Sequence, residues 1–274
     1  MPAGGANHET AENSRHSSDD GSTGSDGVGV AEEQSKTLAA AARGKARSEL
    51  EALFVGLYPA GNAEEDGLKT SRNERLSKGY ESITLTYGEV SAVGFSEILA
   101  KIQDYGGLPE KDGVFYDLGC GTGKPVFVAA AMHPWQRCIG VEILGNLHGI
   151  SLKVLQRWED GFRDSVTVGE TKGVTAEIEF VCGDFTVLDW SDGESLRDVV
   201  FANSTCYGDD LMNKLAQGAA ALKEGAIVVT MTDPVPSPAF EVVEETVMGQ
   251  AGRCATTCFI QRRVAKPPPD FEPV

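Results

Sequence analysis

The sequence lacks paired cysteines, has few histidines and contains no long apolar run. Its six cysteines include no CxxC pair, and two of its four histidines, His8 and His16, lie near the N-terminus. A zinc site is therefore not expected, and the thiols are predicted to be reduced and mostly buried, as in a cytosolic or nuclear protein. No N-terminal stretch has the apolar core of a signal peptide, and no segment is apolar enough to span a membrane, so no membrane association is expected.

Basic residues are scarce as well. The chain carries 41 acids against 24 bases, a formal net charge of −17. Its overall field does not attract nucleic acid, so any contact with phosphates needs a local basic patch. Residues 1–35 hold seven acids, one base and almost no bulky apolar side chains, which predicts a disordered acidic tail.

The remaining length suits one large domain with extensions. We predict a helical N-terminal region over residues 36–105, a main domain over 106–263 and a C-terminal tail over 264–274. In the N-terminal region, four apolar residues recur at helical spacing and predict one buried helix face: Leu50, Leu53, Phe54 and Leu57.

The stretch Val114–Lys124, VFYDLGCGTGK, reads as a strand, a glycine turn and the start of a helix. Such a unit begins a nucleotide-binding βαβ fold. The glycines Gly119, Gly121 and Gly123 alternate closely after Asp117, and this spacing resembles motif I of the seven-stranded S-adenosylmethionine-dependent methyltransferases. In that class, an acid can pair with the ammonium of the ligand's amino acid end. A glycine-rich turn without a ligand is the structural alternative.

Further strands are predicted after this unit, at 137–141, 177–181, 198–202 and 226–231, with a last antiparallel pair at 240–247 and 255–261. Helical stretches between them, one of them predicted over 144–162, imply a parallel α/β sheet with helices on both faces and a ligand at the carboxyl ends of its strands. A polar residue follows each of the first four strands: Asp117, Glu142, Asp184 and Asn203. Glu142 suits the two ribose hydroxyls, and Asp184 with Phe185 suits an adenine amino group and ring.

Two segments precede the glycine turn. Thr86–Glu89, TYGE, comes just before a helix predicted at 90–105, and its Thr and Glu also fit a capping box, which would be a purely structural role. Upstream, bases recur every third residue and form a loose basic stripe if the stretch is helical: Lys69, Arg72, Arg75 and Lys78. This stripe is either a solvated helix face or a weak contact for DNA phosphates.

Taken together, five segments are similar to the non-SET histone lysine methyltransferases, the disruptor-of-telomeric-silencing family. They are TYGEV at Thr86–Val90, DLGCGTGKPV at Asp117–Val126, GVEIL at Gly140–Leu144, GDF at Gly183–Phe185 and FANSTCYG at Phe201–Gly208. The resemblance covers roughly Tyr80–Thr232. It implies a Rossmann-like seven-stranded methyltransferase fold, S-adenosylmethionine as cofactor, a histone or nucleosome as partner and a nuclear location. A monomer is expected.

The resemblance also implies residue roles. Asn203, Tyr87 and Tyr207 are the implied catalytic residues, with Asn203 and Tyr207 beside the methyl group and the incoming lysine. The implied cofactor-binding residues are Thr86, Glu89, Asp117, Gly119, Gly121, Gly123, Glu142, Asp184, Phe185 and Asn203. No strong general base is implied, because an apolar, aromatic-walled channel lowers the pKa of a lysine by desolvation.

The sequence departs from the family at several positions. Lys124 stands where the family usually has Gln, and it brings a positive charge near a cationic sulfonium unless it swings away or pairs with an acid. Ser204 and Thr205 replace a second Asn and a Phe. The family's late Trp-Thr and Tyr-Tyr channel segment has no counterpart in Gln250–Arg263, where only Phe259 is aromatic.

Three other functions stay open. A small-molecule methyltransferase on the same fold would suit the acidic charge, and it would favour a cytoplasmic location. A nucleic-acid amino-methyltransferase would carry an Asn/Asp-Pro-Pro-aromatic motif after the fourth strand, where this chain reads NSTCY. The fold can also bind cofactor or partner without turnover.

Overall fold

The computed structural model describes residues 44–59, 66–110, 112–166, 176–190, 198–249 and 255–264. All of them belong to one compact unit, Ala42–Val274. The predicted tail over 1–35 lies outside the described residues, as does 265–274. No helix in the described ranges is both long and apolar enough to cross a membrane.

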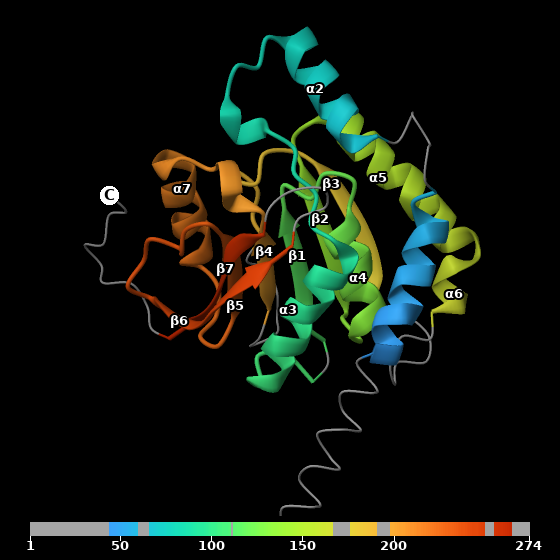
Figure 1. Cartoon of the computed structure of the whole chain (residues 1–274). Coiled ribbons are helices and arrows are strands. Elements are labelled where there is room, and N and C mark those ends of the chain that lie inside the picture. The colour runs from blue at the N-terminus through green and yellow to red at the C-terminus, as the bar shows by residue number, and fades with distance from the viewer. Residues whose placement is uncertain are drawn as a thin grey trace, which may run out of the picture. The chain divides into compact units, whose positions relative to one another are not determined.

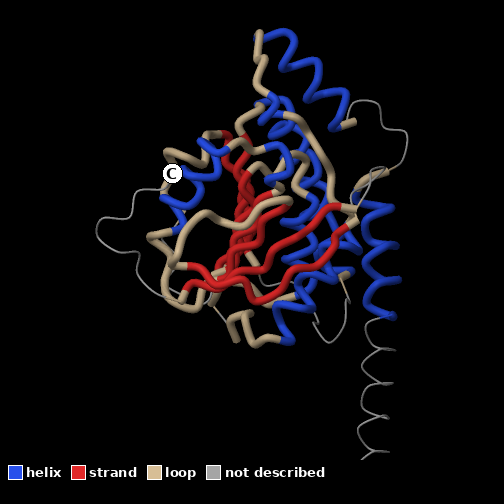
Figure 2. Tube along the Cα trace, turned by 60° about the vertical axis from the view of Figure 1, so that its left-hand side comes forward, coloured by secondary structure: helices blue, strands red, loops and turns tan. Residues whose placement is uncertain are grey.

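The described strands form one mixed sheet in the order β3-β2-β1-β4-β5-β7-β6, seen as a single twisted layer in Figure 2. The first five strands are parallel, and β7 runs antiparallel between β5 and β6. Their bounds are β1 Val114–Leu118, β2 Arg137–Glu142, β3 Glu177–Cys182, β4 Val199–Ala202, β5 Ile227–Met231, β6 Phe240–Met248 and β7 Thr256–Arg263.

Helices cover both faces of this sheet. A helix spans residues 44–57. The others are α2 Gly67–Lys78, α3 Ala92–Asp104, α4 Lys124–Met132, α5 Gly145–Arg157, α6 Arg163–Ser165 and α7 Asp209–Ala219. Single 3₁₀ turns lie at Ile83–Leu85 and Ser204–Cys206, and a π-helical turn at Trp158–Phe162 joins α5 to α6.

Two hydrophobic cores result from the alternation of side chains along the strands. Phe115 of β1 points into the core shared with α3, α4, α5 and the 44–57 helix. Its neighbours Val114 and Tyr116 point into the opposite core, which α7 covers. In Figure 1, α7 accordingly lies on one side of the sheet and α3 and α4 on the other. Burial on both faces explains why β1, β4 and β5 are almost entirely apolar in sequence.

The predicted fold class is confirmed, including the antiparallel pair at the end of the chain. The buried helix face predicted from Leu50, Leu53, Phe54 and Leu57 is confirmed too, because all four pack in the first core.

Two local expectations are wrong. Thr86–Glu89 is not a capping box, because α3 begins at Ala92 and its N-cap is Ser91, whose hydroxyl accepts the Gly94 N–H at 2.9 Å. The helix predicted over 144–162 is α-helical only to Arg157; it passes into the π-helical turn Trp158–Phe162, within which Gly161 breaks the helical backbone with a φ of 149°. At the end of the predicted main domain, β7 extends through Arg263, whose guanidinium is buried against the Leu222 and Ala220 carbonyl oxygens.

Candidate functional site

The glycine turn after β1 forms the floor of the site. Gly119 and Gly121 have φ angles of 86° and 57°, a backbone region that side chains disfavour. The Gly119 and Cys120 N–H groups both donate to the Val141 carbonyl oxygen of β2. A Cβ added at Gly121 would lie 2.3 Å from the Tyr87 ring. Glycine is therefore required here both by the turn and by the close approach of Tyr87.

Two buried carboxylates flank this turn, Asp117 at the end of β1 and Glu142 at the end of β2. Asp117 is 1% exposed, and its Oδ2 has no hydrogen-bond partner among the described residues. Glu142 accepts the Gly121 N–H on Oε2 and the Leu144 N–H on Oε1, each at 2.8 Å. Burial raises the pKa of both carboxyls, and the nearby Glu142 charge raises the Asp117 pKa further. The floor of the site is thus a buried acidic environment.

A cleft of about 250 Å³ opens along the carboxyl ends of the strands. The predicted cofactor residues Thr86, Gly119, Glu142, Asp184, Phe185 and Asn203 line it, with Tyr87 and Tyr207. A hollow of about 20 Å³ adjoins the cleft and shares four lining residues with it: Tyr87, Gly88, Gly119 and Asn203. This smaller hollow is also lined by Asp117, Glu89 and Lys124. The structure therefore gathers the predicted residues around two adjoining spaces, except Gly121 and Gly123, which shape the turn behind them.

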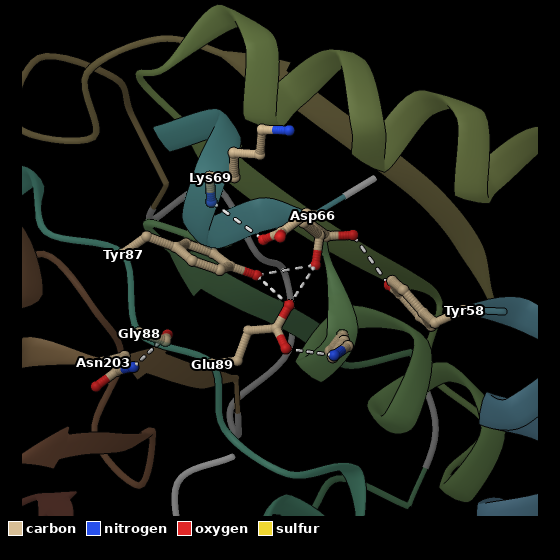
Figure 3. A network of polar contacts seen from close by, with 9 residues as sticks. Tyr58, Asp66, Lys69, Tyr87, Gly88, Glu89 and Asn203 are labelled. Carbon is tan, nitrogen blue, oxygen red and sulfur yellow. Dashed lines mark hydrogen bonds and ion pairs between the residues drawn. The ribbon is translucent and has the colours of Figure 1, made fainter. Parts of the chain in front are cut away.

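The segment Thr86–Glu89 forms a wall of the cleft above the glycine turn. The Tyr87 hydroxyl donates to Glu89 Oε1 at 2.5 Å and lies 3.1 Å from the Thr122 hydroxyl. The Asn203 amide donates to the Gly88 carbonyl oxygen at 2.9 Å, which ties this wall to the end of β4 (Figure 3).

The far end of the cleft is aromatic. Phe185 follows β3, and its ring stacks on that of Tyr207, with centroids 5.9 Å apart and an interplanar angle of 23°. The Tyr207 hydroxyl donates to the Leu118 carbonyl oxygen at 3.1 Å. Burial raises the pKa of Tyr207 far above its ordinary value, and it raises that of Tyr87 as well. Both phenols are therefore neutral hydrogen-bond donors at physiological pH.

Lys124 pairs with an acid, one of the two arrangements that would keep its charge from the sulfonium. Its ammonium lies 2.5 Å from Glu89 Oε2 and 5.0 Å from the centroid of the Tyr58 ring. The family's aromatic channel segment would fall in Gln250–Arg263, of which residues 250–254 lie outside the described residues. Phe259, the aromatic residue of this stretch, does not line the cleft.

The basic stripe is only partly available to a partner. It lies on a helix, α2, but only Lys69 and Arg72 are exposed and without a described side-chain partner. The Arg75 guanidinium turns inward, with a buried Nε and with Nη1 3.5 Å from the Thr86 hydroxyl. Lys78 pairs with Glu74 at 2.6 Å.

Several residues of the site carry no signal in the sequence. Leu211 and Lys214 of α7 line the cleft although they follow no strand directly. Glu74 of α2 is 2% exposed and accepts the Asn146 N–H at 2.8 Å, so it caps the first turn of α5 from another helix. Tyr58 reaches the glycine turn from the end of the 44–57 helix. These contacts join residues far apart in the chain, which neither periodicity nor motif spacing records.

A seven-stranded sheet in this order, with a glycine turn after β1 and acids at the ends of β1 and β2, defines the class of seven-stranded S-adenosylmethionine-dependent methyltransferases. Within that class, the family described as histone methylation protein DOT1 matches residues 70–249, and the chain belongs to it.

Individual proteins resemble the chain more distantly. The H3 lysine-79 specific histone-lysine N-methyltransferase of Drosophila melanogaster is 27% identical over 144 residues, which are 53% of this chain but only 7% of that relative. Among solved structures, TrmN from Thermus thermophilus shares 16% identity at a TM-score of 0.45, over 65% of this chain and 50% of that one. Magnesium protoporphyrin IX methyltransferase from Synechocystis PCC 6803 shares 15% identity at a TM-score of 0.43, over 74% and 99%.

Proposed function

We propose that the chain is an S-adenosylmethionine-dependent lysine N-methyltransferase that acts on a histone, most readily within a nucleosome. The observation that carries this proposal is a coincidence of two ranges. The residues that line the cleft, from Ser82 to Lys214, all fall within the 70–249 match to the histone methylation family. The match therefore covers the whole cleft and not only the sheet.

The residues present fit the cofactor. The buried Asp117 Oδ2, which has no hydrogen-bond partner among the described residues, suits an ammonium group, because a desolvated carboxylate gains most from a nearby cation. Glu142 has both oxygens held by backbone N–H groups, and each oxygen keeps a lone pair for a ribose hydroxyl. Asp184 accepts the Thr186 N–H on Oδ1 at 2.8 Å and lines the cleft beside Phe185, which suits an adenine amino group and ring.

The chemistry asks for positioning more than for acid–base catalysis. The bound cofactor supplies an electrophilic methyl group on a sulfonium. The protein must align an acceptor amine with it and exclude water. Tyr87 and Tyr207 are held neutral by burial, so neither serves as a base. An acceptor lysine would lose its proton because desolvation lowers its pKa, with Asn203 and Tyr207 beside the reacting groups.

The histone substrate implies a nuclear location. We also infer that the chain acts as a monomer and touches DNA phosphates weakly through the exposed bases of α2, Lys69 and Arg72.

The test is a transfer assay with tritiated S-adenosylmethionine on reconstituted nucleosomes, free core histones, total RNA and a protein-free cell extract. Labelled histone, with the label retained on lysine after acid hydrolysis, is the expected result, and an Asn203→Ala variant should lower kcat strongly with cofactor Kd within a few-fold. Label in the small-molecule fraction alone would establish the small-molecule alternative. Cofactor binding without transfer to any acceptor would instead favour the non-enzymatic function.

A further inference from the structure

A cluster of polar groups surrounds the carboxylate of Glu89. Its Oε2 binds the Lys124 ammonium at 2.5 Å, and its Oε1 accepts the Tyr87 hydroxyl at 2.5 Å. The Thr122 hydroxyl lies 3.5 Å from the same Oε1. Figure 3 shows the Tyr87 hydroxyl meeting the Glu89 carboxylate. With donors on both oxygens, Glu89 fastens the 86–89 segment to the glycine turn.

Tyr58 approaches this cluster from outside the sheet. Its hydroxyl donates to the Thr122 backbone oxygen at 2.9 Å, while its ring lies beneath the Lys124 ammonium. The ring is itself fixed, because it stacks on Phe54 and meets the edge of Phe127. Burial raises the pKa of the Tyr58 hydroxyl well above its ordinary value, so it is a permanent donor. Tyr58 thus supplies a hydrogen bond to the turn and an aromatic face to Lys124.

The positive charge of Lys124 balances the partly buried carboxylate of Glu89. Lys124 and Glu89 keep only 22% and 24% of their side chains exposed, so their attraction is screened less than that of a surface pair. The small hollow beside them is also lined by Asp117, a second acid. If Lys124 were neutral, Glu89 would retain a partly buried charge next to that acid. The series of contacts from Tyr58 through Lys124 to Glu89 therefore stabilises the wall in its observed position.

The position of this wall decides the shape of the cleft. Thr86, Tyr87 and Gly88 all line the cleft, and the Tyr87 ring rests on the glycine turn, 2.3 Å from where a Cβ of Gly121 would lie. The Asn203 amide holds the wall at a second point, the Gly88 carbonyl oxygen. Tyr58 precedes the residues matched by the family, which begin at 70. Tyr58, just after the 44–57 helix, therefore supports the cleft from outside the family match, although every residue that lines the cleft lies within it.

We propose that Tyr58 and Lys124 are positioning residues, which hold the 86–89 segment closed over the amino acid end of the cofactor by way of Glu89. The proposal rests on the proposed function, because the wall they hold is a wall of the cofactor cleft. Neither residue needs to touch the cofactor. Removing either side chain should loosen the wall before it weakens the rest of the fold.

The first measurement is hydrogen–deuterium exchange of the ligand-free protein, which needs no cofactor. In Lys124→Gln, amides of residues 84–91 should exchange at least about tenfold faster, since the charge-assisted bond to Glu89 is removed, while strands β1 and β4 keep their protection. Tyr58→Phe, which keeps the ring, should give a smaller increase than Tyr58→Leu, which keeps neither the hydroxyl nor the ring. Lys124→Arg should restore protection. Tyr105→Phe, which removes an exposed hydroxyl bound to Glu244, is the matched control and should change nothing at 84–91.

The second measurement is calorimetric titration with S-adenosylhomocysteine, which carries the amino acid end but no reactive methyl. Its Kd should rise about five- to tenfold in Lys124→Gln and less in Tyr58→Phe, and Glu89→Gln combined with Lys124→Gln should be no worse than either alone. Unchanged exchange at 84–91 in Lys124→Gln would overturn the proposal, and so would exchange that rises equally throughout the sheet. Failure of the wild-type chain to bind would instead count against the proposed function, and the exchange result alone would then decide whether Tyr58 and Lys124 hold the wall.

Discussion

At the scale of single residues, the two buried carboxylates differ in what surrounds them. Glu142 has backbone donors on both oxygens, whereas Asp117 Oδ2 has no partner in the described part of the chain. Burial raises both pKa values, but backbone hydrogen bonds offset the effect only at Glu142. A cation placed beside Asp117 would therefore lower its pKa and release its proton. This difference makes Asp117 the residue whose ionisation should depend most on the cofactor.

Cofactor affinity should accordingly depend on pH. Below the raised pKa, Asp117 is protonated and offers no charge to the cofactor ammonium. Affinity should rise with pH through that value, which lies above the ordinary pKa of about 3.9, and then level off. Calorimetry in two buffers of different ionisation enthalpy measures the number of protons released on binding. In the pH range where affinity rises, binding should release a proton from Asp117.

Asp117→Asn provides the control for this linkage. In the ligand-free protein, the pKa of Asp117 is higher in the folded state than in the unfolded state, so its ionisation destabilises the fold. The stability that protonated Asp117 provides is complete below the unfolded-state pKa and is lost as pH rises through the folded-state pKa. The Asn variant should therefore unfold at a higher temperature near pH 7 than the wild type, yet bind the cofactor more weakly and with no proton release. A wild-type affinity that stays flat with pH would show that Asp117 is ionised throughout.

A second residue-scale prediction concerns Glu142. Glu142→Ala should lose two charge-assisted bonds to the ribose, each worth about 1.5–3 kcal/mol, so the Kd should rise at least about tenfold. The variant also leaves the Gly121 and Leu144 N–H groups without their acceptor, so its melting temperature should fall. The Kd is therefore measured at a temperature where circular dichroism shows folded protein. Unchanged binding there would contradict the ribose assignment.

At the scale of elements, the sequence predicts the strands well, but it predicts poorly the contacts between side chains of different elements. The strands around the site are buried on both faces, so their apolar runs are unmistakable, and the acids Asp117 and Glu142 lie where each run stops. The helix after Glu142 is different, because the apolar period continues past the point where Gly161 leaves helical backbone angles. The partner of Lys124 was not predictable either, because Glu89 and Tyr58 reach it from separate elements.

One such contact joins α2 to α5. Helix α5 has no side-chain cap of its own at Leu144, and Glu74 of α2 accepts the Asn146 N–H instead. Glu74→Ala should lower the free energy of unfolding by about 1–2 kcal/mol, because a helix N-terminal donor is left unsatisfied. Urea denaturation measures the change, with Glu51→Ala as control, since that carboxylate is 53% exposed and should matter by less than about 0.5 kcal/mol. Equal effects of both substitutions would show that the cap is not stabilising.

At the scale of the whole molecule, a net charge of −17 opposes approach to DNA. The proposed substrate, a histone within a nucleosome, is nevertheless surrounded by DNA. The two properties are compatible if acidic surface faces the basic histones while a small basic surface meets phosphate. Of the four bases predicted for that surface, Arg75 is turned inward and Lys78 is paired with Glu74. Lys69 and Arg72 are therefore the two bases that we propose for the phosphate contact.

Reversing both charges, Lys69→Glu with Arg72→Glu, should weaken nucleosome methylation and reduce the slope of log affinity against log salt by about 0.9 for each phosphate no longer neutralised. Methylation of free histone should change little, because no phosphate is involved. Lys45→Glu with Arg47→Glu is the matched control, since it changes the net charge equally on the exposed face of another helix. If both double variants lower nucleosome methylation alike, the effect comes from overall charge. If only the α2 pair acts, and only on nucleosomes, α2 is the surface that meets DNA.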